Sequence, residues 1–282
     1  MSSSDPSEWN HVSVDRDESD DRICWIRLDD PENNNALSLE LILEIGEAVL
    51  YADRQDEVDA IILGSTTQRF CSGGDVKELK GIAIEDGNRF LTAYMETVEM
   101  LRESGKPTLA AVTGDCVAGG NELVMGCDLV VAGNSAKFGQ PEVIVGSTAA
   151  AGGVQILPLI VGQRRAKELL LTGRLLSAEE ALNFGLINRV VNDGDVEEET
   201  AALALEIIDN TSPQAYRVIK AVMKQWSNFA MIGQEVAREV TAAVWHADEF
   251  DERAEEFLSK EPLSPRNFSG TLPQERSGED SS

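Results

Sequence analysis

Short apolar runs recur along the first two thirds of the chain, and each is closed by a glycine or a serine. Such runs are typical of strands that are buried on both faces. The segment CWIRL at 24–28 is different. Its first, third and fifth residues are apolar and alternate with Trp25 and Arg27, which predicts a half-exposed strand. The predicted buried strands cover 59–65 (DAIILGS), 108–114 (TLAAVTG) and 128–133 (DLVVAG).

Amphipathic segments lie between these strands. Apolar residues recur about every 3.6 positions over 39–54 and 90–102, which predicts helices. Ser177 and Glu180 form a capping box that starts a further short helix, and Gly185 can end it. Since strands and helices alternate in this way, the sequence predicts an α/β fold for the first two thirds.

After residue 196 the strand pattern disappears, and helices are predicted over 200–209, 212–228 and 232–259. The last helix is amphipathic, so its apolar side can pack on the chain's own core or on a neighbouring subunit. The pattern favours neither arrangement. The apolar side consists of Val236, Val240, Ala243, Val244, Ala247 and Phe250.

Both ends of the chain are polar. Residues 1–20 are rich in Ser, Asp and Glu, and residues 261–282 combine Pro, Ser and charge, so we expect mobile tails. The predicted organisation is a disordered acidic tail (1–20), an α/β core (21–195), a helical oligomerisation subdomain (196–260) and a flexible tail (261–282).

The composition excludes several function classes. The 282 residues include 50 acidic and 24 basic side chains, which gives a net charge of -26. Such a charge disfavours nucleic acid and anionic membranes as partners. No segment approaches the roughly 18 apolar residues of a membrane span, and the first residues show no signal-peptide pattern. We therefore expect a cytoplasmic protein, and because so many acids repel one another unless salt screens them, a salt-rich cytoplasm.

Cysteine and histidine are too few and too scattered for most metal or disulfide sites. No CxxC pair occurs, so neither a structural zinc site nor a disulfide framework is expected. A nucleophilic triad would have to use His246, since the other histidine, His11, lies in a polar stretch. We expect carboxylates and backbone groups to carry any chemistry.

Two pairs of glycines follow predicted strands and precede helical segments, Gly73–Gly74 in FCSGGD and Gly119–Gly120 in VAGGNE. At such positions free backbone N–H groups can face a ligand, although an ordinary tight connection would look the same. Glu122 follows in the first turn of the second helix, where a carboxylate is favoured in any case. Glu142 lies between Pro141 and an apolar run, an unusual place for a solvated acid.

Four segments together resemble the signatures of the enoyl-CoA hydratase/isomerase (crotonase) superfamily, in its order and spacing. The resemblance covers about residues 20–260 and implies a ββα spiral core with a C-terminal helical subdomain that builds homotrimers or dimers of trimers. It also implies an acyl-CoA thioester substrate, with no cofactor beyond the CoA of the substrate. The segments are FCSGGDVKEL, GDCVAGGNELVMGCDLVVAG, AKFGQPEVIVG with AGGVQ, and AKELLLTGRLLSAEEALNFGLINRVV.

The resemblance also implies roles for individual residues. The backbone N–H groups of Gly74 and Gly119 would form an oxyanion hole for the thioester carbonyl. Glu122 would deprotonate the water that attacks C3, and Glu142 would protonate C2, because hydratases of the superfamily carry Glu at both positions. The implied activity is hydration of a trans-2-enoyl-CoA. Further implied contacts with substrate or CoA are Ala36, Leu37, Ser72, Asp75, Val76 and Gly120, with Lys77 or Lys260 opposing the CoA phosphates.

Alternatives stay open at the level of sequence. The loop at 149–153 (AAAGG) departs from the Pro-Gly-Ala-Gly-Gly of many hydratases, which leaves the acyl group undefined. Hydrolysis of a cyclic acyl-CoA, isomerisation and naphthoyl-CoA-type ring closure are competing reactions. A non-catalytic, RNA-binding member would need a basic helix, for which Arg217, Lys220 and Lys224 are candidates.

Overall fold

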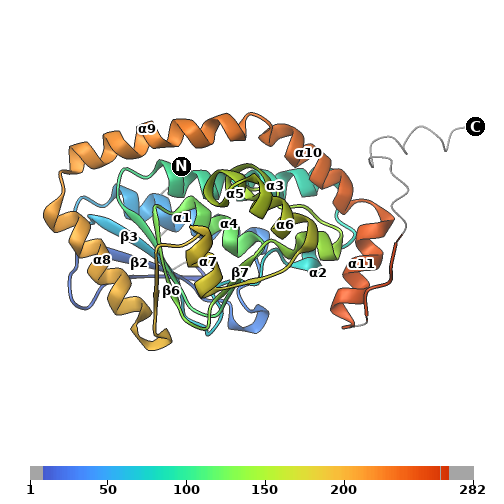
Figure 1. The fold of residues 1–282 in the computed structure, drawn as a ribbon, viewed down its shortest axis with the longest axis horizontal. Coiled ribbons are helices and arrows are strands. Elements are labelled where there is room, and N and C mark those ends of the chain that lie inside the picture. Colours follow the sequence, from blue (N-terminus) through green and yellow to red (C-terminus); the bar gives the residue numbers. More distant parts are fainter. Residues whose placement is uncertain (1–8, 261, 267–282) are drawn as a thin grey trace, which may run out of the picture.

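The computed structural model describes residues 9–260 and 262–266, which fold into two β-sheets with helices packed around them (Figure 1). The larger sheet has the strand order β1-β2-β3-β4-β6-β9, and the smaller has the order β5-β7-β8. In the larger sheet only β1 is antiparallel to its neighbour. The strands are β1 (Val12–Arg16), β2 (Ile23–Leu28), β3 (Ala60–Ser65), β4 (Thr108–Val112), β5 (Asp115–Val117), β6 (Leu129–Gly133), β7 (Lys137–Gly139), β8 (Leu176–Ser177) and β9 (Arg189–Val191).

Helices cover both faces of the larger sheet, and the last three run along one side and one end of the molecule (Figure 1). None of the helices in the described part is long and apolar enough to cross a membrane. The α-helices are α1 (Leu39–Arg54), α2 (Val76–Leu79), α3 (Ile84–Glu103), α4 (Gly119–Gly126), α5 (Gly153–Val161), α6 (Gln163–Thr172), α7 (Ala178–Phe184), α8 (Val196–Asn210), α9 (Pro213–Met231), α10 (Gln234–Trp245) and α11 (Asp248–Leu258). Short 3₁₀ helices are η2 (Pro31–Asn33), η3 (Pro141–Val145) and η4 (Asp193–Asp195).

The predicted strands and helices of the core are present, but the prediction of a half-exposed strand at 24–28 is wrong. Every residue of β2 is buried except Arg27, which is half-buried. The alternation separates two buried layers: Ile23 and Trp25 pack with α8, whereas Ile26 and Leu28 pack on the opposite face of the sheet. A strand between two helix layers buries both of its faces, which the sequence of the strand alone cannot show.

The prediction that residues 1–20 form a disordered tail is wrong for its second half. Residues 12–16 form β1, paired in register with β2 from Val12 opposite Leu28 to Arg16 opposite Cys24. Asp17 then accepts a hydrogen bond from the indole of Trp25 at 2.7 Å. Polar side chains do not prevent this strand, because its backbone bonds and Val12 hold it to the edge of the sheet. Residues 1–8, 261 and 267–282 lie outside the described residues, so the flexible-tail prediction at 261–282 falls largely there.

The single helix predicted over 232–259 is two helices, α10 and α11, because Ala247 adopts an extended conformation (φ -84°, ψ 144°). This break lets Trp245 and Phe250, on either side of it, both reach the core, where they are 4% and 1% exposed. The indole of Trp245 donates a hydrogen bond to the hydroxyl of Ser147 at 2.6 Å. The two helices therefore close over the α/β core of the same chain.

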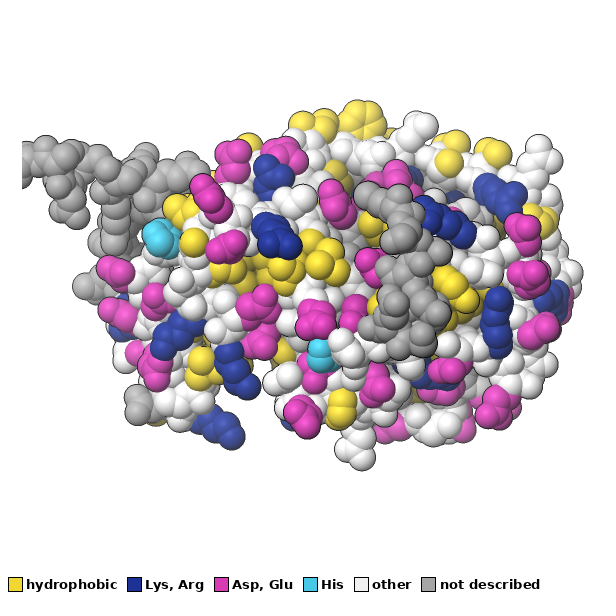
Figure 2. Space-filling model, turned by 180° about the vertical axis from the view of Figure 1, so that it is seen from behind, with side chains coloured by type: hydrophobic (Ala, Val, Ile, Leu, Met, Phe, Trp, Pro, Cys, Tyr) yellow, Lys and Arg dark blue, Asp and Glu magenta, His cyan; other side chains and the backbone are white. Residues whose placement is uncertain are grey.

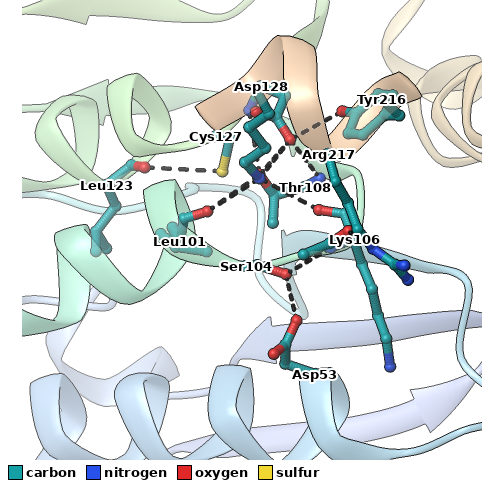
Figure 3. Close-up of polar contacts among 12 residues, drawn as sticks. Asp53, Leu101, Ser104, Lys106, Thr108, Leu123, Cys127, Asp128, Tyr216 and Arg217 are labelled. Atoms are coloured by element: carbon teal, nitrogen blue, oxygen red, sulfur yellow. Dashed lines mark hydrogen bonds and ion pairs between the residues drawn. The ribbon is translucent and has the colours of Figure 1, made fainter. Parts of the chain in front are cut away.

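Helix α9 is held to the core by polar contacts at its inner side (Figure 3). Asp128 accepts hydrogen bonds from the hydroxyl of Tyr216 at 3.0 Å and from the ammonium of Lys220 at 2.7 Å. Arg217 donates to the carbonyl of Gly105 at 3.2 Å, and Lys224 forms ion pairs with acidic side chains of α3. The basic side chains that RNA binding would need are thus engaged in contacts with the protein itself.

Candidate active site

Two glycine loops lie side by side because their backbones pair. Cys71 and Cys116 form an isolated parallel bridge, in which Cys71 N–H donates to Asp115 O at 3.0 Å and Val117 N–H donates to Cys71 O at 3.1 Å. The bridge places the loop after β3 against β5, directly before the glycine pair that opens α4. Gly120 packs so closely on this contact that a Cβ there would lie 2.6 Å from the Cβ of Cys71.

The N–H groups of Gly74 and Gly119 find no acceptor within the part of the chain that the structure describes. Gly119 is the first residue of α4, where helix geometry leaves the N–H without an intrahelical partner. Gly74 follows Gly73, whose carbonyl accepts from Leu37 N–H at 2.8 Å. Both Gly74 and Gly119 line the same cavity, so two free donors are available to one ligand.

Ala118, directly before Gly119, has a conformation that is rare for a residue with a side chain (φ 50°, ψ -124°). The turn from β5 into α4 requires it, since the Ala118 N–H is already bonded to the carbonyl of Gly139 at 2.9 Å. Backbone strain of this kind costs about 1 to 3 kcal/mol and persists only when the surroundings determine the conformation. The orientation of the Gly119 peptide is therefore fixed before any ligand binds.

The cavity has a volume of about 160 Å³ and is mainly apolar. Its walls come from the two glycine loops, from η3 and the loop that follows it, and from helices α3, α10 and α11. The polar groups in it are few, and the carboxyl groups of Glu122 and Glu142 are the acidic ones among the lining residues. The lining includes Leu37, Ser72, Val76, Leu79, Phe90, Leu91, Tyr94, Ile144, Val145, Ala150, Ala151, Trp245, Phe250 and Phe257.

Glu122 is buried (3% exposed) in the first turn of α4. Its Oε1 accepts a hydrogen bond from Gly153 N–H at 2.7 Å. A Cβ on Gly153 would lie 3.1 Å from that oxygen and 2.4 Å from the Cβ of Ala149, so this close approach depends on glycine. Burial raises the pKa of Glu122 to about 7, and hydrogen bonds from the backbone at Gly153 and Ala151 and from Tyr94 limit the rise.

Glu142, in η3, has a different environment. Neither of its carboxyl oxygens has a hydrogen-bond partner among the described residues. Burial first, and then the negative charge of Glu122, raise the pKa of Glu142 well above its usual range. Of the two, Glu142 is therefore the one that holds a proton more strongly, and Glu122 is the better stabilised carboxylate. This is the division of roles that a base and an acid need.

Only some of the other residues assigned from sequence line the cavity. Leu37, Ser72 and Val76 line the cavity, as do Gly74 and Gly119. Asp75 caps α2 by accepting from Lys77 N–H at 2.9 Å, and Gly120 packs on Cys71. Neither of these lines the cavity, nor do Ala36, Lys77 and Lys260, and both lysine side chains are exposed.

Sequence reasoning missed the aromatic part of the cavity. Phe90 and Tyr94 come from α3, and Trp245 and Phe250 from the C-terminal helices. The rings of Phe90 and Trp245 meet edge to face, with centroids 5.6 Å apart. A helical apolar stripe predicts burial, but it cannot distinguish a core position from a cavity wall. His246 is exposed, with its ring at 3.3 Å from the carbonyl of Ile82, and is not part of the site.

No cluster of His, Cys, Asp and Glu in the described ranges could hold a metal ion. The chemistry available at the site is that of two carboxyl groups of unequal proton affinity beside a pair of backbone donors. Such donors stabilise the negative charge that develops on a carbonyl oxygen when the neighbouring carbon gains or loses a proton.

The sequence profile of the family described as Enoyl-CoA hydratase/isomerase matches residues 18–265. The chain belongs to this family. It is 33% identical over 243 residues to a probable enoyl-CoA hydratase of Rhizobium meliloti, covering 86% of this chain and 94% of the relative. It is 34% identical over 262 residues to 4-chlorobenzoyl coenzyme A dehalogenase-2 of an Arthrobacter species, covering 90% and 93%.

Among solved structures, an enoyl-CoA hydratase/isomerase from Xanthobacter autotrophicus Py2 superimposes with a TM-score of 0.80 at 28% identity, covering 89% of this chain and 94% of that one. The protein thus has the crotonase-like α/β core followed by a C-terminal helical region, as the sequence predicted. Family membership makes it an enzyme of the hydratase/isomerase group acting on CoA thioesters. Since relatives of similar identity carry different names, membership alone does not select one reaction.

Proposed function

We propose that the protein is an enoyl-CoA hydratase that adds water across the 2,3 double bond of a trans-2-enoyl-CoA. One observation carries the proposal: Glu122 and Glu142 face the same cavity as the free N–H groups of Gly74 and Gly119. Hydration needs both a base for water and an acid for carbon, and the two environments supply one of each. The mainly apolar cavity suits the acyl chain.

In the proposed mechanism the thioester oxygen accepts hydrogen bonds from Gly74 and Gly119. Glu122 takes a proton from water as the oxygen of that water bonds to C3. The electron pair of the double bond moves onto the thioester, and the resulting enolate oxygen is stabilised by the two N–H groups. Glu142 then gives its proton to C2, and transfer of the proton from Glu122 to Glu142 restores the starting state.

Isomerisation, dehalogenation and thioester hydrolysis are the competing reactions. The description of the family includes isomerases, and one relative is named a dehalogenase. An isomerase moves one proton within the substrate, for which a single carboxylate is sufficient. The presence of two buried carboxyl groups, each held at a different proton affinity, supports hydration over such one-carboxylate chemistry.

A panel of enoyl-CoA, cyclic acyl-CoA and aryl-CoA thioesters, followed by mass spectrometry, tests the proposal. Hydration adds 18 Da to the thioester without releasing free CoA, isomerisation leaves the mass unchanged, and hydrolysis releases CoA. We expect the gain of one water on at least one trans-2-enoyl-CoA. Release of CoA or loss of a halogen without any hydration would contradict the proposal.

We further propose that the protein forms homotrimers or dimers of trimers through the outer face of α9. This face is apolar and exposed, and in Figure 2 apolar side chains stand out along the upper edge of the molecule, where Figure 1 places α9. Its size and continuity are typical of an interface rather than of a free surface. The exposed residues are Val218, Ile219, Val222, Met223, Trp226, Phe229, Ile232 and, at the start of α10, Val236.

Replacing Trp226, which is 75% exposed, by Asp should dissociate the assembly, because a charge in the middle of an apolar interface is desolvated without a partner. Sedimentation equilibrium should show the mass of one chain. Gln163→Asp, at an exposed position of α6 outside the apolar face of α9, serves as the control that keeps the assembly. A wild-type protein that sediments as a monomer at micromolar concentration would refute the proposal.

The acidic surface supports a salt-rich cytoplasm as the place of action. Acidic side chains are spread over the face shown in Figure 2, and basic ones are fewer and scattered. Below about 0.5 M KCl, where the Debye length exceeds about 4 Å, we expect the melting temperature and the oligomer mass to fall. Thermal melts and sedimentation from molar to millimolar KCl measure both quantities. Flat curves would show that the acidic excess has no such role.

The phosphates of CoA require local positive charge on a chain of net charge -26. Lys77, next to the cap of α2, and Lys260, after α11, are exposed and are the proposed contacts. Lys80 is less suited, because it forms an ion pair with Glu255.

A further inference from the structure

Three buried aromatic rings form one wall of the cavity and take no part in the proposed mechanism. Phe90 comes from α3, and Trp245 and Phe250 come from either side of the break between α10 and α11. The indole of Trp245 packs against both other rings, with centroids 5.6 Å from Phe90 and 6.4 Å from Phe250. Phe257 also lines the cavity but is 51% exposed, so the three buried rings belong to the closed part of the cavity.

Helix α3 gives the distance from this wall to the carbonyl-binding end of the cavity. Tyr94 marks that end, because a Cβ on Gly119 would lie 2.9 Å from the Tyr94 oxygen. Phe90 lies one helical turn before Tyr94 on α3. Gly87 lies one turn earlier still, and a Cβ there would lie 3.5 Å from the indole of Trp245. Since a helix rises about 1.5 Å per residue, Trp245 lies about 6 to 10 Å from Tyr94 along α3.

The loop that follows Glu142 holds Trp245 in place. The indole N–H of Trp245 donates to the hydroxyl of Ser147 at 2.6 Å, and the N–H of Ser147 donates to the carbonyl of Glu142 at 2.9 Å. One turn earlier on α10, the hydroxyl of Thr241 is hydrogen-bonded to the hydroxyl of Thr148 at 2.5 Å. These bonds fix the position of the indole relative to the segment that carries the acid.

We propose that Trp245 is a specificity-determining residue that closes the far end of the cavity and restricts the substrate to acyl groups of at most about eight carbons. The inference rests on the proposed function in one respect, namely that the thioester carbonyl lies at Gly74 and Gly119. An extended chain of C–C bonds advances about 1.3 Å per carbon, so a distance of about 6 to 10 Å holds about five to eight carbons. The cavity volume of about 160 Å³ agrees, because an apolar cavity of about 150 Å³ accommodates a molecule the size of benzene.

Calorimetric titration with saturated acyl-CoA thioesters measures the length limit without requiring hydration. In the wild type, each added CH₂ group that is buried should tighten binding about fourfold. Beyond about eight carbons the chain meets the indole, so dodecanoyl-CoA should bind at least about tenfold more weakly than octanoyl-CoA. In Trp245→Ala this order should reverse, because the longer chain can enter the space of the indole. Trp9→Ala, which removes a ring that packs on Tyr51, should keep the wild-type order.

A second measurement uses the wild type and so does not depend on the folding of Trp245→Ala. A bromine atom quenches indole fluorescence on contact, so hexanoyl-CoA with bromine on its terminal carbon should quench part of the protein's fluorescence, whereas hexanoyl-CoA itself should not.

Binding of the brominated thioester without quenching overturns the proposal. Tight binding of dodecanoyl-CoA to the wild type, or the wild-type order of chain lengths in folded Trp245→Ala, has the same consequence. If the length limit and the quenching are found but no enoyl-CoA is hydrated, the proposed function fails and the role of Trp245 stands. If no acyl-CoA binds, both proposals fail.

Discussion

Glu122→Gln and Glu142→Gln should each lower the rate of hydration at least about a hundredfold, the lower range for losing a general acid or base. Gln at 122 cannot accept the proton of water, and Gln at 142 has no acidic proton for C2. Affinity for the CoA ester should change little, because the N–H groups of Gly74 and Gly119 remain. Steady-state kinetics on a trans-2-enoyl-CoA, with binding measured on the saturated analogue, separates the two quantities.

The matched control is Glu198→Gln, an exposed acid on α8 with no role in the site. It should retain wild-type kinetics. If only one of the two active-site variants loses activity, the reaction uses one carboxylate, and the two-carboxylate mechanism is wrong. Near wild-type turnover in either variant has the same consequence.

Gly119→Pro should reduce turnover by several hundredfold, because proline lacks the N–H that we assign to the oxyanion hole. Loss of one such donor costs about 3 to 4 kcal/mol of transition-state stabilisation. Proline is compatible with the first position of a helix, which Gly119 occupies in α4. The helix itself should therefore form, although the added ring meets Leu37 and Tyr94, which lie within 3 Å of a Cβ at this position.

Gly119→Ala provides the control for this crowding, because it adds the Cβ and keeps the N–H. We expect it to be much more active than Gly119→Pro, and circular dichroism should show both variants folded. Equal losses in the two variants would mean that crowding, and not the missing donor, is responsible. High activity in folded Gly119→Pro would remove Gly119 from the hole.

Local sequence patterns predicted most of the helices and strands, because apolar periodicity and capping residues act within each element. The predicted helix at 39–54 agrees with α1, whose N-cap Ser38 accepts from Leu41 N–H, and the capping box of Ser177 and Glu180 is present. Helix α3 begins six residues before the predicted start, in a polar first turn that apolar periodicity does not register. The strand β1 was missed because its partner strand, rather than its own composition, stabilises it.

The same distinction applies to the site. The glycine pairs and both glutamates were found because each lies in a short conspicuous segment, but the bridge between Cys71 and Cys116 that joins the two loops is set by tertiary structure. The unequal environments of the glutamates depend on Gly153, 31 positions after Glu122, whose approach no local pattern predicts. Tyr94 and Trp245 look like ordinary core residues in sequence.

In the proposed mechanism, peptide N–H groups bind the thioester carbonyl, whereas two carboxyl side chains transfer the protons. A point mutation alters a side chain directly, but it removes a peptide N–H only when it introduces proline. A lineage can therefore exchange Glu122 or Glu142 and keep a site that still binds and polarises a thioester. If the proposed roles hold, new reactions can arise on this scaffold by one or two substitutions, which is consistent with relatives of nearly equal identity that carry the names of a hydratase and a dehalogenase.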